Sequence, residues 1–472
     1  MVAHCYFGST CKEALQTKDI FSPYDKRVVS KVALCDKFDA NTILDIAQKA
    51  SLKAKNIPLH QRINWLLDVA QKLELSREEM AQTITDEVGK PISFARIEVD
   101  RCIETIKLSA NAILHVNGET IDTTATPSGK KSLAFYKREP VGVVLAITPF
   151  NFPLNLVAHK IVPALVAGNA VILKPTSQAP LTAFKFAKMF IESSFATPDA
   201  LSLIYSGEGV NDALVSSDIP RVISFTGSLA VGREITQKAG IKKIALELGG
   251  NAATYIDTSA DIKMAALRCA VGAFINSGQV CISLQRIYVH EAIYEVFAQA
   301  LMEETKSLHV GSPYEENTFI GPMINENAVQ KALHWLESAV NEGAKVVCGF
   351  TCKDLMFAPT IVSEVTQTMN IVCEEVFAPI VSLIKVKTYE EAKEKMNHSP
   401  YGLQYSIFSN DLKMVQDAID NLEAGGVVIN DIPTLRFDIQ PYGGSKNSGI
   451  GKEGPKYALL DDYTQIKSVV IC

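Results

Sequence analysis

The sequence predicts an α/β protein with two successive domains, each built around a mainly parallel sheet, and a small separate β element. From residue 141 onward, short apolar strands alternate with helices, which is typical of a parallel sheet covered on both faces. A second alternating series begins after Gly249 and Gly250. The chain has 472 residues, which is more than one small core holds. Together these observations favour at least two domains.

The composition is that of an ordinary globular protein, with a net charge of −6 and no cluster of basic residues. A nucleic-acid partner is therefore not expected. The N-terminus lacks the order of a signal peptide, and no run of about 18 apolar residues could span a bilayer. We expect a cytoplasmic protein without a membrane partner. Ten scattered cysteines without Cys-x-x-Cys pairs argue against a disulfide framework and a zinc site, so no metal is expected.

Residues 39–116 carry apolar side chains at helical spacing and predict a helical layer. Ser76 and Glu79 form a capping-box signature at the start of one of these helices. Between Gly118 and Glu139 the pattern becomes polar and β-prone around a turn signal, which predicts a protruding hairpin. The predicted helices of this layer cover residues 42–55, 58–74, 76–88 and 92–115.

The first alternating series predicts a dinucleotide-binding architecture, although the usual Gly-x-Gly-x-x-Gly is absent. Its expected strands are 141–147, 170–174, 201–205, 221–225 and 244–248, with helices at 153–167, 180–194 and 229–239 and a short helix between the third and fourth strands.

The second series predicts another α/β domain. The tail, residues 457–472, alternates in polarity and suits an edge strand that needs another chain or a hairpin to pair with. The expected strands of this series are 253–256, 286–290, 344–348, 379–386, 404–408 and 425–430, with helices at 260–277, 291–307, 325–342, 389–397 and 411–423.

The segment Phe274–Ser283, FINSGQVCIS, places Cys281 in a turn-like setting after a helical run. A thiol in this place could attack an electrophilic carbon, provided that other groups activate it and stabilise the resulting oxyanion. The alternative is that Cys281 is a small buried apolar residue, as most free cysteines are.

Two motifs follow neighbouring strands of the first series. In TPFNFP, Asn151 lies at the carboxyl edge of the sheet, where its amide could donate to an oxyanion; an Asx-turn or a helix cap is the alternative. In KPTS, Lys174 and Ser177 could contact the sugar or phosphate of a nucleotide, whereas a solvated lysine that closes a strand is the common alternative.

Three further motifs carry polar groups at strand ends. The backbone of FTGS, with Gly227 and Ser228, suits a pyrophosphate at a helix N-terminus, although a tight turn would use the same residues. In ELGG, Glu247 could be a general base or a surface carboxylate. EEVFAP offers one carboxylate that could hold a ribose hydroxyl and an aromatic ring that could bracket a base.

In their order along residues 148–379, TPFNFP, LKPTS, FTGS, ELGG, GQVC and EEVFAP resemble the aldehyde dehydrogenase superfamily. The resemblance implies that Cys281 is the catalytic thiol, which forms a thiohemiacetal with the aldehyde. It implies that Asn151 and the Cys281 backbone N–H form the oxyanion hole. Glu247 is then the base that activates water to hydrolyse the thioester, as in members that do not acylate coenzyme A.

The resemblance also implies a Rossmann-type cofactor domain at 1–118 and 140–248, a catalytic domain at 249–446, and an oligomerisation element at 119–139 and 447–472. A homodimer or homotetramer is expected, and the sequence leaves the choice open. Expected cofactor contacts are Thr148, Phe150, Lys174, Ser177, Gly227, Ser228 and Glu375, with Phe377 as a packing wall.

Ser177 departs from the family pattern in a way that concerns the cofactor. Many members that prefer NAD have a glutamate at this place, whose charge would repel a 2′-phosphate. Serine removes that repulsion, which predicts use of NADP or of both NADP and NAD.

Three basic residues, Arg101, His159 and Arg436, could select a hydroxylated or anionic substrate, although structural ion pairs are an equal alternative. Members with a similar sequence around Arg436 resemble enzymes for small polar aldehydes such as lactaldehyde. Succinic semialdehyde or another anionic semialdehyde is the second hypothesis, and Val280 argues against a phosphonate. A coenzyme A-acylating dehydrogenase and a hydrolase that pairs Cys281 with a histidine are less favoured alternatives, and the physiological aldehyde stays open.

Overall fold

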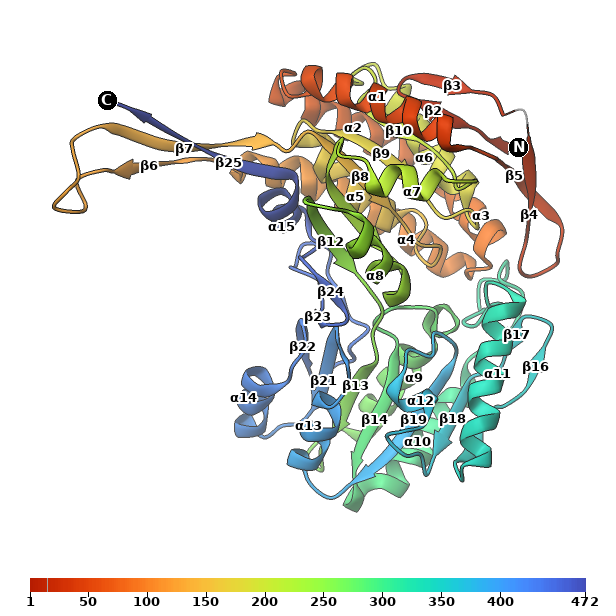
Figure 1. Cartoon of the computed structure of the whole chain (residues 1–472). Coiled ribbons are helices and arrows are strands. Elements are labelled where there is room, and N and C mark those ends of the chain that lie inside the picture. Colours follow the sequence, from red (N-terminus) through yellow and green to blue (C-terminus); the bar gives the residue numbers. More distant parts are fainter. Residues whose placement is uncertain (15) are drawn as a thin grey trace.

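The structure is a computed structural model that describes residues 1–14 and 16–472. It contains two large sheets in separate lobes, and a narrow arm extends from one lobe (Figure 1). The lobe with the first sheet also contains both the N-terminal strands and the first helices of the chain (Figure 1). The predicted α/β fold class is confirmed, and the domain boundaries stay predictions.

The first sheet has eight strands. In spatial order these are β24 (Gly449–Ile450), β12 (Lys243–Glu247), β11 (Pro220–Thr226), β8 (Val143–Ile147), β9 (Ala170–Lys174), β10 (Leu201–Leu203), β2 (Cys5–Phe7) and β3 (Thr10–Lys12). The run from β12 to β10 is parallel. Along the chain, β9 and β10 follow on one side of β8, and β11 and β12 are then added on its other side. This reversal of strand order creates a crevice at the carboxyl ends of β8 and β11, where α/β proteins bind ligands.

The second sheet has seven strands, and all of them run parallel except the edge strand β15. Every residue of β13 and β21 is buried, because helices cover both faces. The sequence did not predict β18. In spatial order the strands are β15 (Lys345–Cys348), β18 (Thr360–Ser363), β19 (Ile380–Val386), β14 (Leu284–His290), β13 (Ala252–Ile256), β21 (Gln404–Phe408) and β22 (Gly426–Ile429).

The predicted helices are present, with ends that differ by a few residues. Most bury one face, whereas every residue of α5 is buried. The helices are α1 (Lys37–Ala54), α2 (Leu59–Leu75), α3 (Arg77–Val88), α4 (Ile92–Ala112), α5 (Asn155–Val166), α6 (Pro180–Ile191), α7 (Val210–Ser216), α8 (Leu229–Lys238), α9 (Ile262–Phe274), α10 (Tyr294–Ser307), α11 (Glu326–Asn341), α13 (Tyr389–Asn397) and α14 (Leu412–Asn421), with short helices α12 (Asn370–Cys373) and α15 (Pro455–Ala458).

Two local predictions are wrong. Ser76 and Glu79 form no capping box, because the Ser76 hydroxyl donates to the carbonyl oxygen of Lys72 (2.9 Å) in the preceding helix. The predicted helix at 260–277 ends at Phe274, because Asn276 and Ser277 adopt left-handed backbone conformations with φ of +51° and +56°. The helix therefore stops before the segment that carries Cys281.

The arm is a three-stranded antiparallel sheet formed by the predicted hairpin and the tail (Figure 1). Its strands are β6 (Glu119–Asp122), β7 (Leu133–Pro140) and β25 (Thr464–Ile471). β25 pairs with β7 along its full length, from Thr464 opposite Pro140 to Ile471 opposite Leu133. The prediction of a hairpin, and of a tail strand that pairs with it, is confirmed.

A second small sheet at the N-terminus was not predicted. It contains β1 (Val2–Ala3), β5 (Val28–Ala33) and β4 (Thr17–Phe21). Among residues 1–14 and 16–472, no helix is long and apolar enough to cross a membrane.

Candidate active site

The segment that carries Cys281 turns sharply between α9 and β14. Asn276, Ser277 and Gly278 all have positive φ, which reverses the chain immediately after the helix. The Ser277 hydroxyl donates to the carbonyl oxygen of Gly321 (2.8 Å), and the Gln279 side chain accepts from the backbone N–H of Ile324 (2.9 Å). These bonds fix the loop, which leaves the thiol partly buried at its end.

Gly278 allows the loop to pack directly against the backbone at Ala378, just before β19. A Cβ at Gly278 would lie 2.2 Å from the carbonyl oxygen of Ala378. The φ of +69° also disfavours any residue with a side chain. Glycine is therefore required at this turn for two independent reasons.

Asn151 lies between β8 and α5, as predicted, and contacts the thiol loop. Its amide nitrogen donates to the carbonyl oxygen of Gln279 (3.0 Å). Its Oδ1 is buried and has no hydrogen-bond partner among the described residues. The structure therefore brings Asn151 into contact with the Cys281 loop. The second hydrogen of the Asn151 amide is left for a further acceptor.

A buried ion pair that the sequence analysis missed holds the Asn151 loop. Lys90 pairs with Glu98, and its ammonium donates to the carbonyl oxygen of Asn151 (2.7 Å). Glu98 accepts from the backbone N–H groups of Leu154 and Asn155 (2.9 and 3.1 Å). Both charges come from the helical layer, more than fifty residues away in the sequence.

Glu247 ends β12 and is buried beside the same site. Its Oε2 has no hydrogen-bond partner in the described part of the chain. A Cβ at Gly443 would lie 2.5 Å from the carbonyl oxygen of Gly451 and 2.8 Å from the Oε1 of Glu247, so glycine is needed for this close approach. Burial raises the pKa of Glu247 well above its usual range, the negative charge of Glu453 raises it further, and Lys160 opposes both effects. The environment of Glu247 therefore favours the protonated form of this carboxyl more than water does.

Cys281 contacts a tyrosine that follows it by 161 residues. The Sγ of Cys281 lies 3.0 Å from the Tyr442 hydroxyl. Burial raises the pKa of the thiol to about 11, while the hydrogen bond from Tyr442 and the charge of Arg436 lower it. Burial thus raises the pKa of both the Cys281 thiol and the Glu247 carboxyl.

Five of the eight predicted cofactor residues share one cavity at the crevice between β8 and β11. This cavity has a volume of about 430 Å³. Burial lowers the pKa of Lys174 there to about 8, and the Ser228 hydroxyl caps α8 by accepting from Val231 N–H (3.4 Å). The lining includes Thr148, Lys174, Ser177, Gly227 and Ser228, and the acids Asp212 and Glu234 on its rim pair with Lys238.

Phe150, Glu375 and Phe377 lie outside the lining of that cavity. Glu375 accepts from the backbone N–H of Gly250 (3.0 Å), and burial raises its pKa to about 7. Phe377 has a φ of +57°, and its ring meets that of Phe150 edge to face at 6.0 Å. The contact between Phe150 and Phe377 joins the first lobe to the second.

The three predicted substrate residues all have charged or polar partners. Arg101 forms a bidentate pair with Asp438 (2.7 and 2.9 Å), and His159 also contacts this carboxylate (2.9 Å). Arg436 donates to Glu453 (3.0 Å) and contacts His159 (3.2 Å). The ion-pair alternative thus describes the resting structure, and their role as substrate contacts stays a prediction.

Lys160, Asp438 and Glu453 complete this buried group and were missed by the sequence analysis. The Lys160 ammonium lies 3.1 Å from Glu453 and 3.3 Å from the Ser224 hydroxyl. Adjacent His159 and Lys160 in an otherwise apolar helix were the available signal, but their acidic partners are more than 270 residues away.

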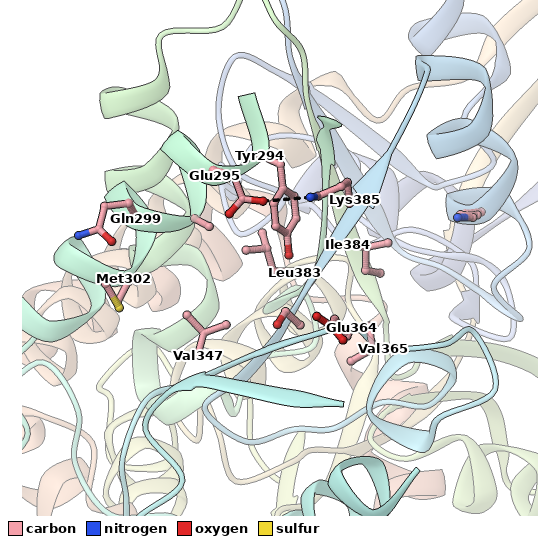
Figure 2. A pocket seen from close by; sticks show the side chains of 13 residues that line it. Tyr294, Glu295, Gln299, Met302, Val347, Glu364, Val365, Leu383, Ile384 and Lys385 are labelled. Atoms are coloured by element: carbon pink, nitrogen blue, oxygen red, sulfur yellow. Dashed lines mark hydrogen bonds and ion pairs between the residues drawn. The ribbon is translucent and has the colours of Figure 1, made fainter. Parts of the chain in front are cut away.

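A second hollow lies on the other lobe, between α10 and the strands β18 and β19. Figure 2 shows Lys385 reaching across it to Glu295, with which it forms an ion pair of 3.0 Å. The described residues that line it include none of the predicted site residues. We therefore assign no part of the chemistry to it.

Three features define the class of protein: a parallel sheet with a cavity at its strand reversal, a cysteine on a loop that an asparagine amide contacts, and a buried glutamate at a strand end. They are the features of nicotinamide-dependent dehydrogenases that use a cysteine nucleophile.

Comparison with known proteins identifies the family. The model of the aldehyde dehydrogenase family matches residues 10–469. A lactaldehyde dehydrogenase of Methanococcus maripaludis is 38% identical over 458 residues, which cover 96% of this chain and 97% of that protein. The structure of aldehyde dehydrogenase 21 from Physcomitrella patens, in complex with the reaction product succinate, superimposes with a TM-score of 0.97 at 35% identity, covering 100% of this chain and 98% of that one.

A third relative was solved with a cofactor. The glyceraldehyde-3-phosphate dehydrogenase of Methanocaldococcus jannaschii, complexed with NADP, has a TM-score of 0.91 and 38% identity, with 97% of this chain and 99% of that chain covered. The chain therefore belongs to the aldehyde dehydrogenase family, and it is an NAD(P)-dependent aldehyde dehydrogenase. The resemblance inferred from the ordered motifs is confirmed.

Substituting Gly278 by alanine tests whether the turn positions the thiol. We expect Gly278→Ala to lower the free energy of unfolding by about 2–4 kcal/mol, because the new Cβ meets the Ala378 carbonyl in a left-handed conformation. We also expect kcat to fall about 100-fold, because the loop must move. Urea denaturation and steady-state kinetics measure the two effects.

Gly240→Ala is the matched control. Gly240 has a φ of +66°, and a Cβ there would meet nothing within 4 Å. This variant should lose about 1 kcal/mol of stability and keep its activity. Equal kinetic losses in both variants would contradict a specific role for the turn.

Proposed function

We propose that the protein oxidises a small polar aldehyde, such as lactaldehyde, to the carboxylic acid with NADP or NAD. The observation that carries this proposal is the charged group beside the thiol. Three basic side chains, Arg101, Lys160 and Arg436, pair with two carboxylates, Asp438 and Glu453. The excess positive charge favours a hydroxylated or monoanionic aldehyde over an aliphatic one. The name of the Methanococcus maripaludis relative supports the same substrate class.

In the proposed reaction, the Cys281 sulfur attacks the aldehyde carbon, the thiol proton passes to the aldehyde oxygen, and a thiohemiacetal forms. The Asn151 amide and the Cys281 backbone N–H donate to this oxygen while it carries negative charge. NADP or NAD, when bound, supplies the acceptor for the hydride, and the hydroxyl proton of the thiohemiacetal is released to water as the thioester forms. Glu247 then takes a proton from water, the resulting hydroxide attacks the thioester carbon, and the Cys281 thiolate leaves with the acid released.

The cavity at the strand reversal suits a dinucleotide. The hydroxyls of Thr148 and Thr226 are buried at the ends of β8 and β11 and have no partner among the described residues. Lys174 and Ser177 offer donors to a ribose or its 2′-phosphate, and Gly227 and Ser228 lie at the N-terminus of α8. Glu375 would hold the nicotinamide ribose, with Phe150 and Phe377 beside it.

A substrate panel with both cofactors tests the proposal. Lactaldehyde, glyceraldehyde, succinic semialdehyde and hexanal should be compared by kcat/KM, with Cys281→Ala as the inactive control. Preference for lactaldehyde or glyceraldehyde is expected, and preference for hexanal would contradict the proposal. Formation of NADPH or NADH without coenzyme A separates this function from an acylating dehydrogenase, and product formed without any nicotinamide would indicate a hydrolase.

Succinic semialdehyde is the second candidate substrate. Arg101 and Arg436 line one hollow, where a distal carboxylate could pair with them, and the Physcomitrella patens relative was solved with succinate. The same panel decides between the two candidates.

Replacing Glu247 by glutamine separates acylation from hydrolysis. Glu247→Gln is expected to give a burst of reduced cofactor equal to the enzyme concentration, followed by turnover at least 100-fold slower, because water then lacks its base. In the unmodified enzyme the slow step should accelerate as pH rises through the raised pKa of Glu247, because the carboxyl must lose its proton before it can act as the base. Stopped-flow absorbance measures both phases. A burst that is absent, or unchanged steady turnover, would place the base elsewhere.

The choice of cofactor is tested at Ser177. Ser177→Glu is expected to lower the NADP/NAD ratio of kcat/KM at least tenfold, because its charge repels a 2′-phosphate. Ser177→Gln is the control of similar size without the charge and should retain most of the original ratio. An unchanged ratio in Ser177→Glu would remove the basis for NADP use.

The arm is proposed to form a homodimer or homotetramer. Its tail strand exposes Ile466 (57%) and Val470 (58%) on one face, which suits a contact with another chain. Ile466→Asp with Val470→Asp should reduce the molecular mass found by analytical ultracentrifugation, whereas Lys467→Ser on the opposite face should not. An unchanged mass in the double variant would exclude the arm as the contact.

A further inference from the structure

Apolar side chains and one tyrosine form a buried cluster around the Cys281 thiol. Val280, Ile282, Leu403 and Tyr442 are buried around it, and Phe152 and Ile275 complete the cluster. Among these side chains, the Tyr442 hydroxyl alone can donate a strong hydrogen bond, and it lies 3.0 Å from Sγ. A substrate carbon bonded to this sulfur would therefore have Tyr442 as a neighbour.

Arg436 fixes the position of Tyr442. Its guanidinium carbon lies 3.8 Å from the centre of the tyrosine ring. The guanidinium is held in turn by Glu453 and by His159. A cation over the ring face withdraws electron density from the phenol, which makes its hydroxyl a better donor.

We infer that Tyr442 determines specificity for aldehydes with a hydroxyl on the carbon next to the carbonyl. This inference rests on the proposed function of Cys281 as the nucleophile. When Sγ bonds the aldehyde carbon, the thiol proton is transferred to the former carbonyl oxygen, and the sulfur becomes a thioether. A thioether is a weak acceptor, so the Tyr442 hydroxyl exchanges its contact with sulfur for one with the substrate hydroxyl.

The geometry favours this exchange. The oxygen on the second substrate carbon is separated from the sulfur by three bonds, so rotation about one bond brings it beside the group that touched the sulfur. The methyl end of such a substrate then meets the apolar side chains of the cluster. Arg101 and Arg436 are both paired with carboxylates, so we expect them to act on a substrate charge at a greater distance from the thiol.

Lactaldehyde and propanal provide a matched substrate pair, because they differ only in this hydroxyl. We expect the wild-type enzyme to prefer lactaldehyde in kcat/KM. Tyr442→Phe is expected to lower the lactaldehyde/propanal ratio of kcat/KM about 3–10-fold, the effect of one net hydrogen bond. Loss of the contact with the thiol affects both substrates equally and cancels in the ratio, as does any general structural effect.

Tyr288→Phe is the control, because it removes a buried tyrosine hydroxyl in the core of the other lobe. Its ratio should equal that of the wild type. An unchanged ratio in Tyr442→Phe would overturn the inference, and so would a wild-type enzyme that oxidises both aldehydes equally well, a measurement that needs no variant. Oxidation of neither aldehyde would instead contradict the proposed function.

Discussion

The site depends on a buried cluster of charges that joins α5 to the chain segment at 436–453. Lys160 and Glu453 form its centre, with side chains that are 1% and 8% exposed. Arg436 shares the Glu453 carboxylate, and His159 and Arg101 share Asp438. Removing one partner from such a buried pair costs about 3–5 kcal/mol, because a charge is then left without compensation. The cluster therefore holds the segment 436–453 in place. This segment positions Tyr442 beside the Cys281 thiol and Gly443 beside Glu247.

The same cluster shifts the pKa values of two carboxylic acids in opposite directions. Glu453 lies between Lys160 and Arg436, which hold its pKa at about 2 despite burial, whereas burial and the Glu453 charge raise the pKa of Glu247. The lowered pKa of Glu453 contributes stability above the unfolded value near 4.5, and this contribution disappears as pH falls toward 2. Glu247 acts in the opposite direction, since its ionisation at higher pH disfavours the folded state. The two buried carboxyl groups therefore have pKa values that are shifted in opposite directions, as is typical of sites that use one carboxyl for proton transfer.

Local patterns predicted most of the fold, and the failures have specific causes. Continuous apolar strands and helical spacing located both sheets, because burial on two faces leaves a strong signal. The predicted end of α9 was wrong because Asn276 and Ser277 adopt left-handed backbone conformations that end the helix. The spacing of apolar residues carries no information about such conformations. The motif order identified Cys281, Asn151 and Glu247 as candidates, and the structure brings Asn151 to the thiol loop. The partners of Arg101, His159 and Arg436 could not be inferred, since pairing over hundreds of residues depends on the completed packing.

The apolar setting of the thiol is compatible with catalysis. With a pKa of about 11, forming the thiolate at pH 7 costs about 5 kcal/mol, since each pKa unit is worth about 1.4 kcal/mol. A turnover of about 10 per second corresponds to a total barrier of about 16 kcal/mol, so about 11 kcal/mol is left for the attack itself. An adjacent amide donor and an aldehyde held in contact with sulfur make such a barrier attainable. Because oxidants react with the thiolate, a thiol that stays neutral until the aldehyde arrives is protected between turnovers.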